Sequence, residues 1–441
     1  MNISNLQILL QEAINNATTP IQYLQLAKAI QALNVGQIRS VASFSNLPSA
    51  ASNEGLLVFV VADARLYWST GTDWYDVTIN LPSSSWAWGD NSYGQLGTNN
   101  TTARSSPVSV VGGFTDWCQV SINTPSLGVR SNGTVWAWGN NSFGQLGDET
   151  TVAKSSPVSV IGGFTDWCYV AASSAHSLGV RKNGTAWAWG DNSRGQLGNG
   201  SVGSNQSSPV SVVGGFTDWC QVSAGRYHSL GVRTNGTAWA WGWQCAGRLG
   251  NGIIFNGNVA SPVSVLGGFS DWSQVSAGNT HGLGVRTNGT AWAWGCNTCG
   301  ILGDNSVVTR SSPVSVVGGF TDWCQVSAGN QHSLGVRSNG TAWAWGLGFV
   351  GQLGIGINTV ASSPVSVVGG FTDWCQVSAG RYHSLGVRTN GTAWAWGCNG
   401  SGILGTGDSV NRSSPASVAG GVADWCQVSA GSAHSMAVRR S

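Results

Sequence analysis

The sequence predicts a mainly β protein: a seven-bladed β-propeller over residues 83–441, closed into a ring by its C-terminal strands and preceded by a small β-unit and a helical pair. Two observations predict the propeller. The motif WAWG recurs seven times at intervals of 50 to 53 residues. Each interval holds four strand-like segments, the number in one propeller blade. The copies begin at Trp86, Trp136, Trp187, Trp239, Trp292, Trp343 and Trp394.

A β-hairpin forms the centre of each repeat and is clearest at His228–Gly242. Ser229–Arg233 and Thr237–Trp241 are rich in β-formers, and Asn235-Gly236 lies between them. Asn-Gly favours a two-residue type I′ turn, whose twist matches that of the flanking strands. We therefore expect a tight hairpin in every blade.

The two ends of the repeat array predict a closed ring. The first copy starts at WAWG without the preceding half of the hairpin, and the last stops where the Asn-Gly turn would follow. Pairing of Ala430–Arg439 with Ser85–Gly89 would complete one shared blade. An open array would need capping repeats with a polar outer face, and the sequence has none. Closure would also remove the exposed strand edges of an open array.

The residues before the propeller predict two further segments. Residues 1–34 suggest two short helices that need a partner to be stable, which fits an anchor or an oligomerisation segment such as a homotrimer. Residues 35–82 predict a small β-unit or linker module of about three strands, at Leu56–Val61, Arg65–Trp68 and Trp74–Val77.

Composition excludes several classes of partner. Charged residues make up 9% of the chain, the net charge is +2, and no basic run occurs, so we expect no nucleic acid ligand. No apolar run approaches the ~20 residues that span a bilayer, so we expect no membrane insertion. The N-terminus lacks the basic region of a secretory signal, which predicts synthesis in the cytoplasm.

One histidine recurs at a fixed position of the repeat, where the first copy has Pro125. A ring of histidines can bind metal or act as a pH switch. Different blades hold these side chains too far apart for shared coordination, however, so we expect packed, structural histidines. They are His176, His228, His281, His332, His383 and His434.

One Asp and one Arg also recur in all seven copies, in FTDW and after LGV. A catalytic carboxylate would occur once, so we expect a structural Asp–Arg pair within or between blades. The first three copies carry Asp116, Asp166, Asp218, Arg130, Arg181 and Arg233. Six of the ten cysteines share another repeat position, occupied once by Ser273, and we expect small buried side chains there rather than a disulfide framework.

Partner binding is expected at tryptophans and at loops. Most tryptophans should fill the space between blades, and the second Trp of WAWG is the better candidate for partial exposure. The candidates for partner binding are Trp88, Trp138, Trp189 and Trp243. The loops after each WAWG vary most, are polar and nearly uncharged, and lie on one face of the ring, which suits a glycan or a protein.

Two resemblances bear on function. The motifs WGDNSYGQLG, SAGxxHSL and NGT in residues 83–441 resemble the repeat of the RCC1 (regulator of chromosome condensation) family, which implies a seven-bladed propeller with a structural His in each repeat. The segment Leu47–Val77 resembles small modules of tail-fibre and other virion proteins of bacteriophages, especially phages of cyanobacteria.

We find no nucleophile–base pair, phosphate loop or metal cluster, and expect a protein that is not an enzyme and needs no cofactor or metal. The leading hypothesis is a bacteriophage virion structural protein, assembled in the host cytoplasm. Residues 1–82 would bind other virion proteins, and the propeller loops would bind a host surface glycan or protein. The alternatives are an RCC1-like regulator, such as a guanine nucleotide exchange factor, and a propeller scaffold or lectin.

Overall fold

The computed structural model describes residues 38–41, 57–60, 65–69, 74–76 and 83–440. The predicted helical segment 1–34 lies outside the described residues. The chain divides into two compact units, Met1–Leu81 and Pro82–Ser441.

The first unit contains one four-stranded sheet, in the order β1-β2-β3-β4. These strands are β1 (Ile38–Val41), β2 (Leu57–Val60), β3 (Arg65–Ser69) and β4 (Trp74–Asp76). β1 pairs with β2 in parallel, and the other two pairs are antiparallel. Strands β2 to β4 match the three that the sequence predicts. The sequence gives no sign of β1, because four residues of mixed polarity are too few for a strand pattern.

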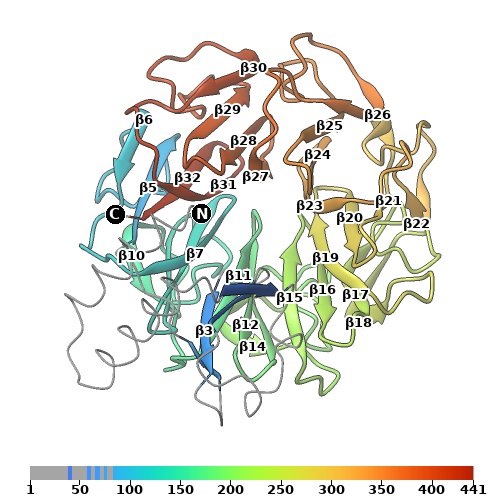
Figure 1. The fold of residues 1–441 in the computed structure, drawn as a ribbon. Coiled ribbons are helices and arrows are strands. Elements are labelled where there is room, and N and C mark those ends of the chain that lie inside the picture. The colour runs from blue at the N-terminus through green and yellow to red at the C-terminus, as the bar shows by residue number, and fades with distance from the viewer. Residues whose placement is uncertain (1–37, 42–56, 61–64, 70–73, 77–82, 441) are drawn as a thin grey trace. The chain divides into compact units, whose positions relative to one another are not determined.

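The second unit is a seven-bladed propeller of four-stranded antiparallel sheets (Figure 1). Blades 1 to 3 consist of β7 (Trp117–Ile122), β8 (Pro125–Arg130), β9 (Val135–Gly139) and β10 (Lys154–Ser159); β11 (Trp167–Ala172), β12 (His176–Arg181), β13 (Ala186–Gly190) and β14 (Gln206–Ser211); and β15 (Trp219–Ala224), β16 (His228–Arg233), β17 (Ala238–Gln244) and β18 (Gly257–Ser264). Blades 4 to 6 consist of β19 (Trp272–Ala277), β20 (His281–Arg286), β21 (Ala291–Gly295) and β22 (Arg310–Ser315); β23 (Trp323–Ala328), β24 (His332–Arg337), β25 (Ala342–Gly346) and β26 (Ala361–Ser366); and β27 (Trp374–Ala379), β28 (His383–Arg388), β29 (Ala393–Gly397) and β30 (Arg412–Ser417). A short 3-10 turn, η3 (Thr298–Gly300), lies in the loop between β21 and β22.

The closing blade joins the two ends of the repeat array, as predicted. It consists of β31 (Trp425–Ala430), β32 (His434–Arg440), β5 (Ser83–Gly89) and β6 (Arg104–Ser109). In its register, Val438 lies opposite Ser85 and His434 opposite Gly89. Figure 1 shows β5, in blue, beside β32, in red.

Glutamine side chains also join the innermost strands of neighbouring blades. Val170 N donates to Gln119 Oε1 at 2.8 Å, and Gln119 Nε2 donates to Val170 O at 2.8 Å. The same two-way contact spans the closure, where Gln427 accepts from Val120 N at 3.0 Å. An inner strand would otherwise leave one edge of backbone groups unpaired, so each Gln satisfies that edge across the gap between blades.

The hairpin turn differs from the predicted type. Gly236 has a φ of 75°, whereas Asn235 is not among the residues with positive φ, which a type I′ turn requires at both positions. Gly236 N donates to Arg233 O at 2.8 Å, and Arg233 N donates to Thr237 O at 3.0 Å. The loop is therefore a type I turn followed by a left-handed glycine. The Asn235 side chain accepts from Thr237 N at 3.1 Å, which holds the asparagine in its ordinary conformation.

The core lies between blades. The second Trp of each motif is buried against the Trp that begins the inner strand of its own blade, as in the 5.8 Å contact between the rings of Trp138 and Trp117. Both rings share a buried cluster with Ala87 and Leu96 of the neighbouring blade. Trp138 Nε1 donates to Gln95 O at 3.0 Å, so the large ring is buried without an unpaired donor. In the described residues, no helix has the length and apolar character needed to cross a bilayer.

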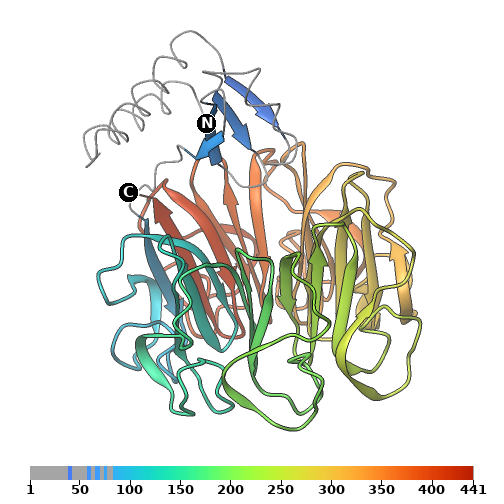
Figure 2. The same ribbon diagram turned by 90° about the horizontal axis from the view of Figure 1, so that it is seen from below.

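The propeller has two unlike faces, which Figure 2 shows from the side. One end of the ring carries the turns between first and second strands and the long loops between third and fourth strands, and we call this end the loop face. We call the turn face the opposite end, which carries the Asn-Gly turns. Equivalent residues repeat around each face because the strand order is the same in every blade.

Candidate functional site

The recurring histidines are buried and join neighbouring blades. His383 Nε2 lies 2.9 Å from Ser435 Oγ of the next blade. Burial lowers the pKa of His383 to about 3, because the surroundings disfavour the charged ring. Equivalent contacts link His176 to Ser229, His281 to Ser333, His332 to Ser384 and His434 to Ser126.

His228 is the exception in this ring. The residue that would carry the partner hydroxyl is Gly282, and neither ring nitrogen of His228 has a hydrogen-bond partner. The Trp294 ring occupies the adjacent space, since a Cβ on Gly282 would lie 2.5 Å from it. Burial lowers the pKa of His228 well below its ordinary value, and the nearby Arg248 guanidinium lowers it further.

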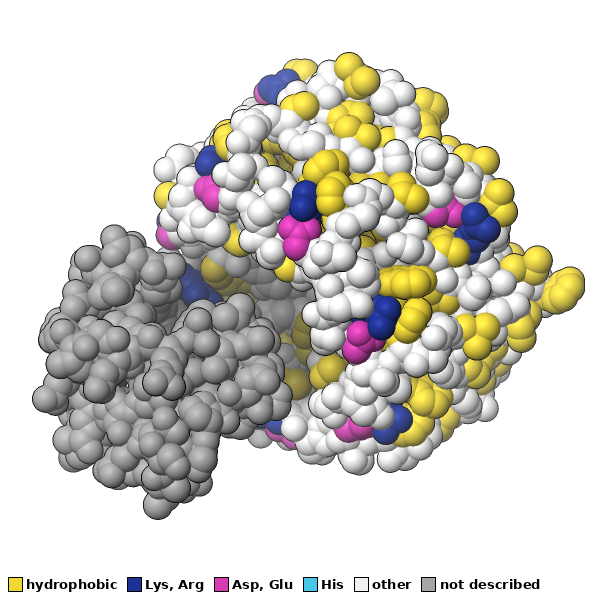
Figure 3. Space-filling model, turned by 45° about the vertical axis from the view of Figure 1, so that its right-hand side comes forward, with side chains coloured by type: hydrophobic (Ala, Val, Ile, Leu, Met, Phe, Trp, Pro, Cys, Tyr) yellow, Lys and Arg dark blue, Asp and Glu magenta, His cyan; other side chains and the backbone are white. Residues whose placement is uncertain are grey.

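The recurring Asp and Arg pair within each blade, on the turn face. Arg130 Nε lies 2.8 Å from Asp116 Oδ1, and the two other predicted pairs, Arg181–Asp166 and Arg233–Asp218, are each 2.7 Å. The guanidinium also covers an aromatic ring, as where Arg181 lies 4.0 Å from the centre of Phe164. Figure 3 shows such basic and acidic pairs at intervals around the ring. Each charge has a partner in its own blade, which leaves little for a ligand.

The expectation of exposed second tryptophans is wrong. Trp88, Trp138 and Trp189 are each 0% exposed, so none can contact a partner. Each donates its Nε1 to a backbone carbonyl of the neighbouring blade. The first Trp of the motif, such as Trp136, is the half-buried one, because it lies nearer the turn face. Trp243 directly follows the motif Trp239–Gly242, so it is not the second Trp, and it is half-buried on the loop face.

The expected burial of the recurring cysteines is also wrong, since five of the six are exposed and Cys426 is half-buried. Cys220 and Cys375 are exposed, and each donates its thiol to a backbone carbonyl of its own blade at 3.3 Å. The strand register shifts at this position, between Trp219 and Gln221, and the bulge turns the side chain out of the packed interior. Within the described part of the chain, no group of three or more His, Cys, Asp or Glu could hold a metal ion.

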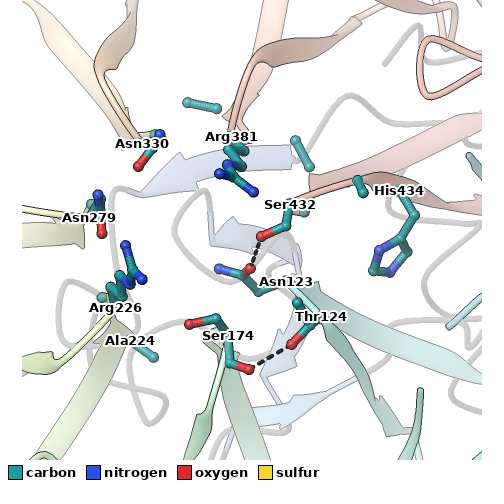
Figure 4. A pocket seen from close by; sticks show the side chains of 18 of the residues that line it. Asn123, Thr124, Ser174, Ala224, Arg226, Asn279, Asn330, Arg381, Ser432 and His434 are labelled. Atoms are coloured by element: carbon teal, nitrogen blue, oxygen red, sulfur yellow. Dashed lines mark hydrogen bonds between the residues drawn. The ribbon is translucent and has the colours of Figure 1, made fainter. Parts of the chain in front are cut away.

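A cavity of about 440 Å³ opens at the centre of the loop face. Its wall is made by the turns between the first and second strands of all seven blades (Figure 4). Asn279, Asn330 and Ser174 point polar groups toward it, and Arg226 and Arg381 reach in from two separate blades.

Glycines let these turns pack closely around the cavity. A Cβ on Gly380 would lie 2.6 Å from His383 Cε1 and 2.7 Å from Gly431 O of the next blade. The Gly-x-x-His pattern therefore positions the two residues between Gly and His. In blades 3 to 7, which share this pattern, the two intervening residues are Arg-Tyr, Asn-Thr, Asn-Gln, Arg-Tyr and Ser-Ala.

Blade 3 breaks the symmetry of the loop face. The Trp243 ring lies between two guanidinium groups, 4.9 Å from that of Arg194 and 4.3 Å from that of Arg248. The Tyr227 ring meets its edge at 5.6 Å. Arg248 is only 3% exposed and donates its Nε to Cys245 O at 2.8 Å. We call Arg194, Tyr227, Trp243 and Arg248 the blade 3 cluster.

The same blade carries an apolar loop tip. Ile254 is 53% exposed and Phe255 is 79% exposed, the largest value among the exposed apolar side chains of the described residues. Sequence reasoning named Trp243 but missed its neighbours. A signal was present: this copy departs furthest from DNSxGQLG and precedes the longest interval between motifs.

Comparison with known proteins identifies relatives of the propeller. The model of the RCC1-like domain matches residues 126–437, and that of the regulator of chromosome condensation (RCC1) repeat matches residues 85–122. The ultraviolet-B receptor UVR8 of Arabidopsis thaliana is 32% identical over 252 residues, which is 56% of each chain. The human probable E3 ubiquitin-protein ligase HERC3 is 33% identical over 207 residues, which is 45% of this chain and 19% of that protein. This chain thus spans about half of the first relative and a fifth of the second.

Two solved structures share the fold. Prp20p of Saccharomyces cerevisiae superimposes with a TM-score of 0.74 at 21% identity, over 81% of this chain and 92% of that chain. Human WBSCR16 gives a TM-score of 0.73 at 21% identity, over 81% of this chain and 99% of that chain.

Proposed function

Because this chain belongs to the RCC1-like family of propellers, we propose that it is a non-enzymatic regulator that acts by binding a protein partner on its loop face. The observation that carries the proposal is the blade 3 cluster with its neighbouring apolar tip. A propeller built only for architecture has no need of one blade that differs so strongly from the others.

The composition of this surface supports protein docking. Trp, Tyr and Arg are the residues that most often dominate the binding energy of protein interfaces. Here one Trp, one Tyr and two Arg residues meet in a single cluster, beside Phe255 and Ile254, which are exposed to solvent. The cluster is also held in place before binding, since Arg248 is fixed by its bond to Cys245 O. A prearranged site loses less side-chain entropy when a partner binds.

Nucleotide exchange on a small GTPase is the more specific form of this proposal. Prp20p, whose fold this chain shares, binds Gsp1p and histones. The virion role inferred from Leu47–Val77, with anchoring through residues 1–82, a homotrimer and a host-surface ligand, gains no support from the family matches, which lie within residues 85–437. It stays a prediction.

The test is capture of a partner by purified full-length protein and by loop-face variants. Ile254→Ser with Phe255→Ser, and separately Trp243→Ala, should reduce capture of the same partner at least tenfold. Lys182→Thr is the matched control, because Lys182 is exposed on the turn face and Thr stands at this position in other blades. The proposal fails if the loop-face variants capture as well as wild type or if the control loses the partner equally. Release of fluorescent GDP from a purified GTPase of the Gsp1p class tests the exchange reaction separately.

A further inference from the structure

Two of the seven turns around the central cavity have the same charged sequence. Gly225–His228 and Gly380–His383 both read Gly-Arg-Tyr-His, whereas the equivalent turns carry Asn, Ser or Thr. The first lies in blade 3 and the second in blade 6. Three steps around a ring of seven place Arg226 and Arg381 on opposite sides of the cavity, as Figure 4 shows.

Both arginines are exposed and free of acidic partners. Neither takes part in any of the ion pairs found among the described residues, although all seven recurring Arg residues of the turn face do. The Arg226 guanidinium lies 5.1 Å from the centre of the Tyr227 ring, and that of Arg381 lies 5.0 Å from Tyr382. Each Tyr thus supports its Arg in position without neutralising it.

The rest of the wall offers donors more than acceptors. Asn123 Oδ1 accepts from Ser432 Oγ at 2.6 Å, which leaves the amide nitrogen of Asn123 directed into the cavity (Figure 4). Asp90 is the one carboxylate among the lining residues, all of which are described. Its oxygens already accept from Ser92 Oγ at 2.8 Å and from Gln95 Nε2 at 2.7 Å.

Histidine adds no positive charge to this site at neutral pH. His434 lines the cavity, but burial lowers its pKa to about 4 even though Asp90 favours the charged ring. The lining therefore carries two positive charges, from the arginines, and one negative charge, from Asp90, whose oxygens already accept from Ser92 and Gln95. In a chain with 9% charged residues, these two cations without acidic partners face the same polar cavity.

We propose that this cavity binds a small polyanion, a soluble metabolite that carries two or more phosphate groups, with phosphate oxygens held by Arg226 and Arg381. Guanidinium groups match phosphate oxygens in both charge and geometry. The volume of about 440 Å³ lies within the range of small-molecule sites and is too small for a folded partner. The site shares only Tyr227, which supports Arg226, with the blade 3 cluster. It includes neither Trp243 nor Phe255, so its test is independent of protein docking through those residues.

The experiment is calorimetric titration of the full chain with inorganic pyrophosphate and with tripolyphosphate. We expect one saturable site, with an affinity that falls as NaCl is raised. Arg226→Gln combined with Arg381→Gln should weaken binding at least a hundredfold. Both arginines are exposed, so the variant should keep the thermal midpoint of the wild type. The matched control is Arg104→Gln, which removes one positive charge from an exposed residue outside both the cavity lining and the blade 3 cluster and should change affinity less than twofold.

Three outcomes would overturn the proposal: neither phosphate compound binds, both bind the double variant as tightly as wild type, or the control loses binding equally. A hexaglutamate peptide distinguishes the source of the anion. If that peptide binds through Arg226 and Arg381 while both phosphate compounds do not, the cavity receives an acidic protein segment and the metabolite proposal is wrong. Failure here leaves capture through Phe255 and Trp243 unaffected, so the two proposals fail separately.

Discussion

Acidification should unfold the propeller through its buried histidines. Burial lowers the pKa of four of them from 6.5 to about 3, because the packed space between blades accommodates only the neutral ring. These four are His176, His281, His332 and His383. His434, with a pKa of about 4, acts in the same direction.

The sign and size of the effect follow from proton binding. The pKa in the folded state is below that in the unfolded chain, so the unfolded chain takes up protons first as the pH falls. The stabilisation is complete above pH ~6.5 and is lost progressively between ~6.5 and ~3. At pH 5, roughly 1.5 pH units below the ordinary histidine pKa, each of the four histidines lowers the free energy of unfolding by about 2 kcal/mol, at ~1.4 kcal/mol per pH unit. Together they cost about 8 kcal/mol, comparable to the whole stability of a typical domain.

Urea unfolding followed by tryptophan fluorescence at pH 7.5, 6.5, 5.5 and 5.0 measures this loss. Twenty-four tryptophans, most of them in the propeller repeats, give a strong signal. The control is His383→Gln, whose side-chain amide can reach Ser435 Oγ and does not titrate. Between pH 7.5 and pH 5, its free energy of unfolding should fall by about 2 kcal/mol less than that of the wild type. A free energy of unfolding that changes by less than about 2 kcal/mol between pH 7.5 and 5 would refute the reasoning.

Three further predictions concern packing and pairing. Gly380→Ala should lower the free energy of unfolding, measured by chemical denaturation, by about 1–3 kcal/mol, because the new Cβ would lie 2.6 Å from His383. The control Gly400→Ala should be neutral, because the nearest neighbour of its Cβ would be at 4.0 Å. Equal effects of the two substitutions would contradict the close approach at Gly380. Asp373→Asn should lower the free energy of unfolding by about 1 kcal/mol or less, because its ion pair with Arg388 is partly exposed. A much larger loss would show that the ion pair stabilises more than its own blade. Trp138→Phe should lower the free energy of unfolding by about 1–3 kcal/mol, because it leaves a cavity in the core and removes one of the two donors to Gln95 O, the other being Ser126 Oγ. An unchanged unfolding midpoint would argue against this packing and this bond.

The repeat predicted the fold because the sequence of each blade contains the local signals for its own strands and turn. Alternation in the strands, the Asn-Gly dipeptide and the spacing of WAWG are local signals, and they agree in seven copies. Ring closure followed from the complementary ends of the array, and the pairing of β32 with β5 confirms it. The turn type did not follow, because Asn-Gly also fits a turn in which only Gly236 has positive φ.

Burial and the candidate site depend on contacts between blades, which a repeat pattern does not reveal. Both tryptophans of WAWG lie on one face of the strand, and only the neighbouring blade determines that Trp88 is buried. Cys220 is exposed because of a bulge that the residue types do not signal. The cluster around Trp243 needs Arg194 from the preceding blade, and no spacing rule brings these two residues together.

Hydrogen–deuterium exchange of the full chain, followed at the backbone amides of β5 and β32, tests the closed ring most directly. Ring closure predicts that peptides covering Ser83–Gly89 and His434–Arg440 exchange as slowly as those of the equivalent pair β13 and β12 in blade 2. Rapid exchange at β5 and β32, with protection retained in blade 2, would mean that the two ends of the array are not paired.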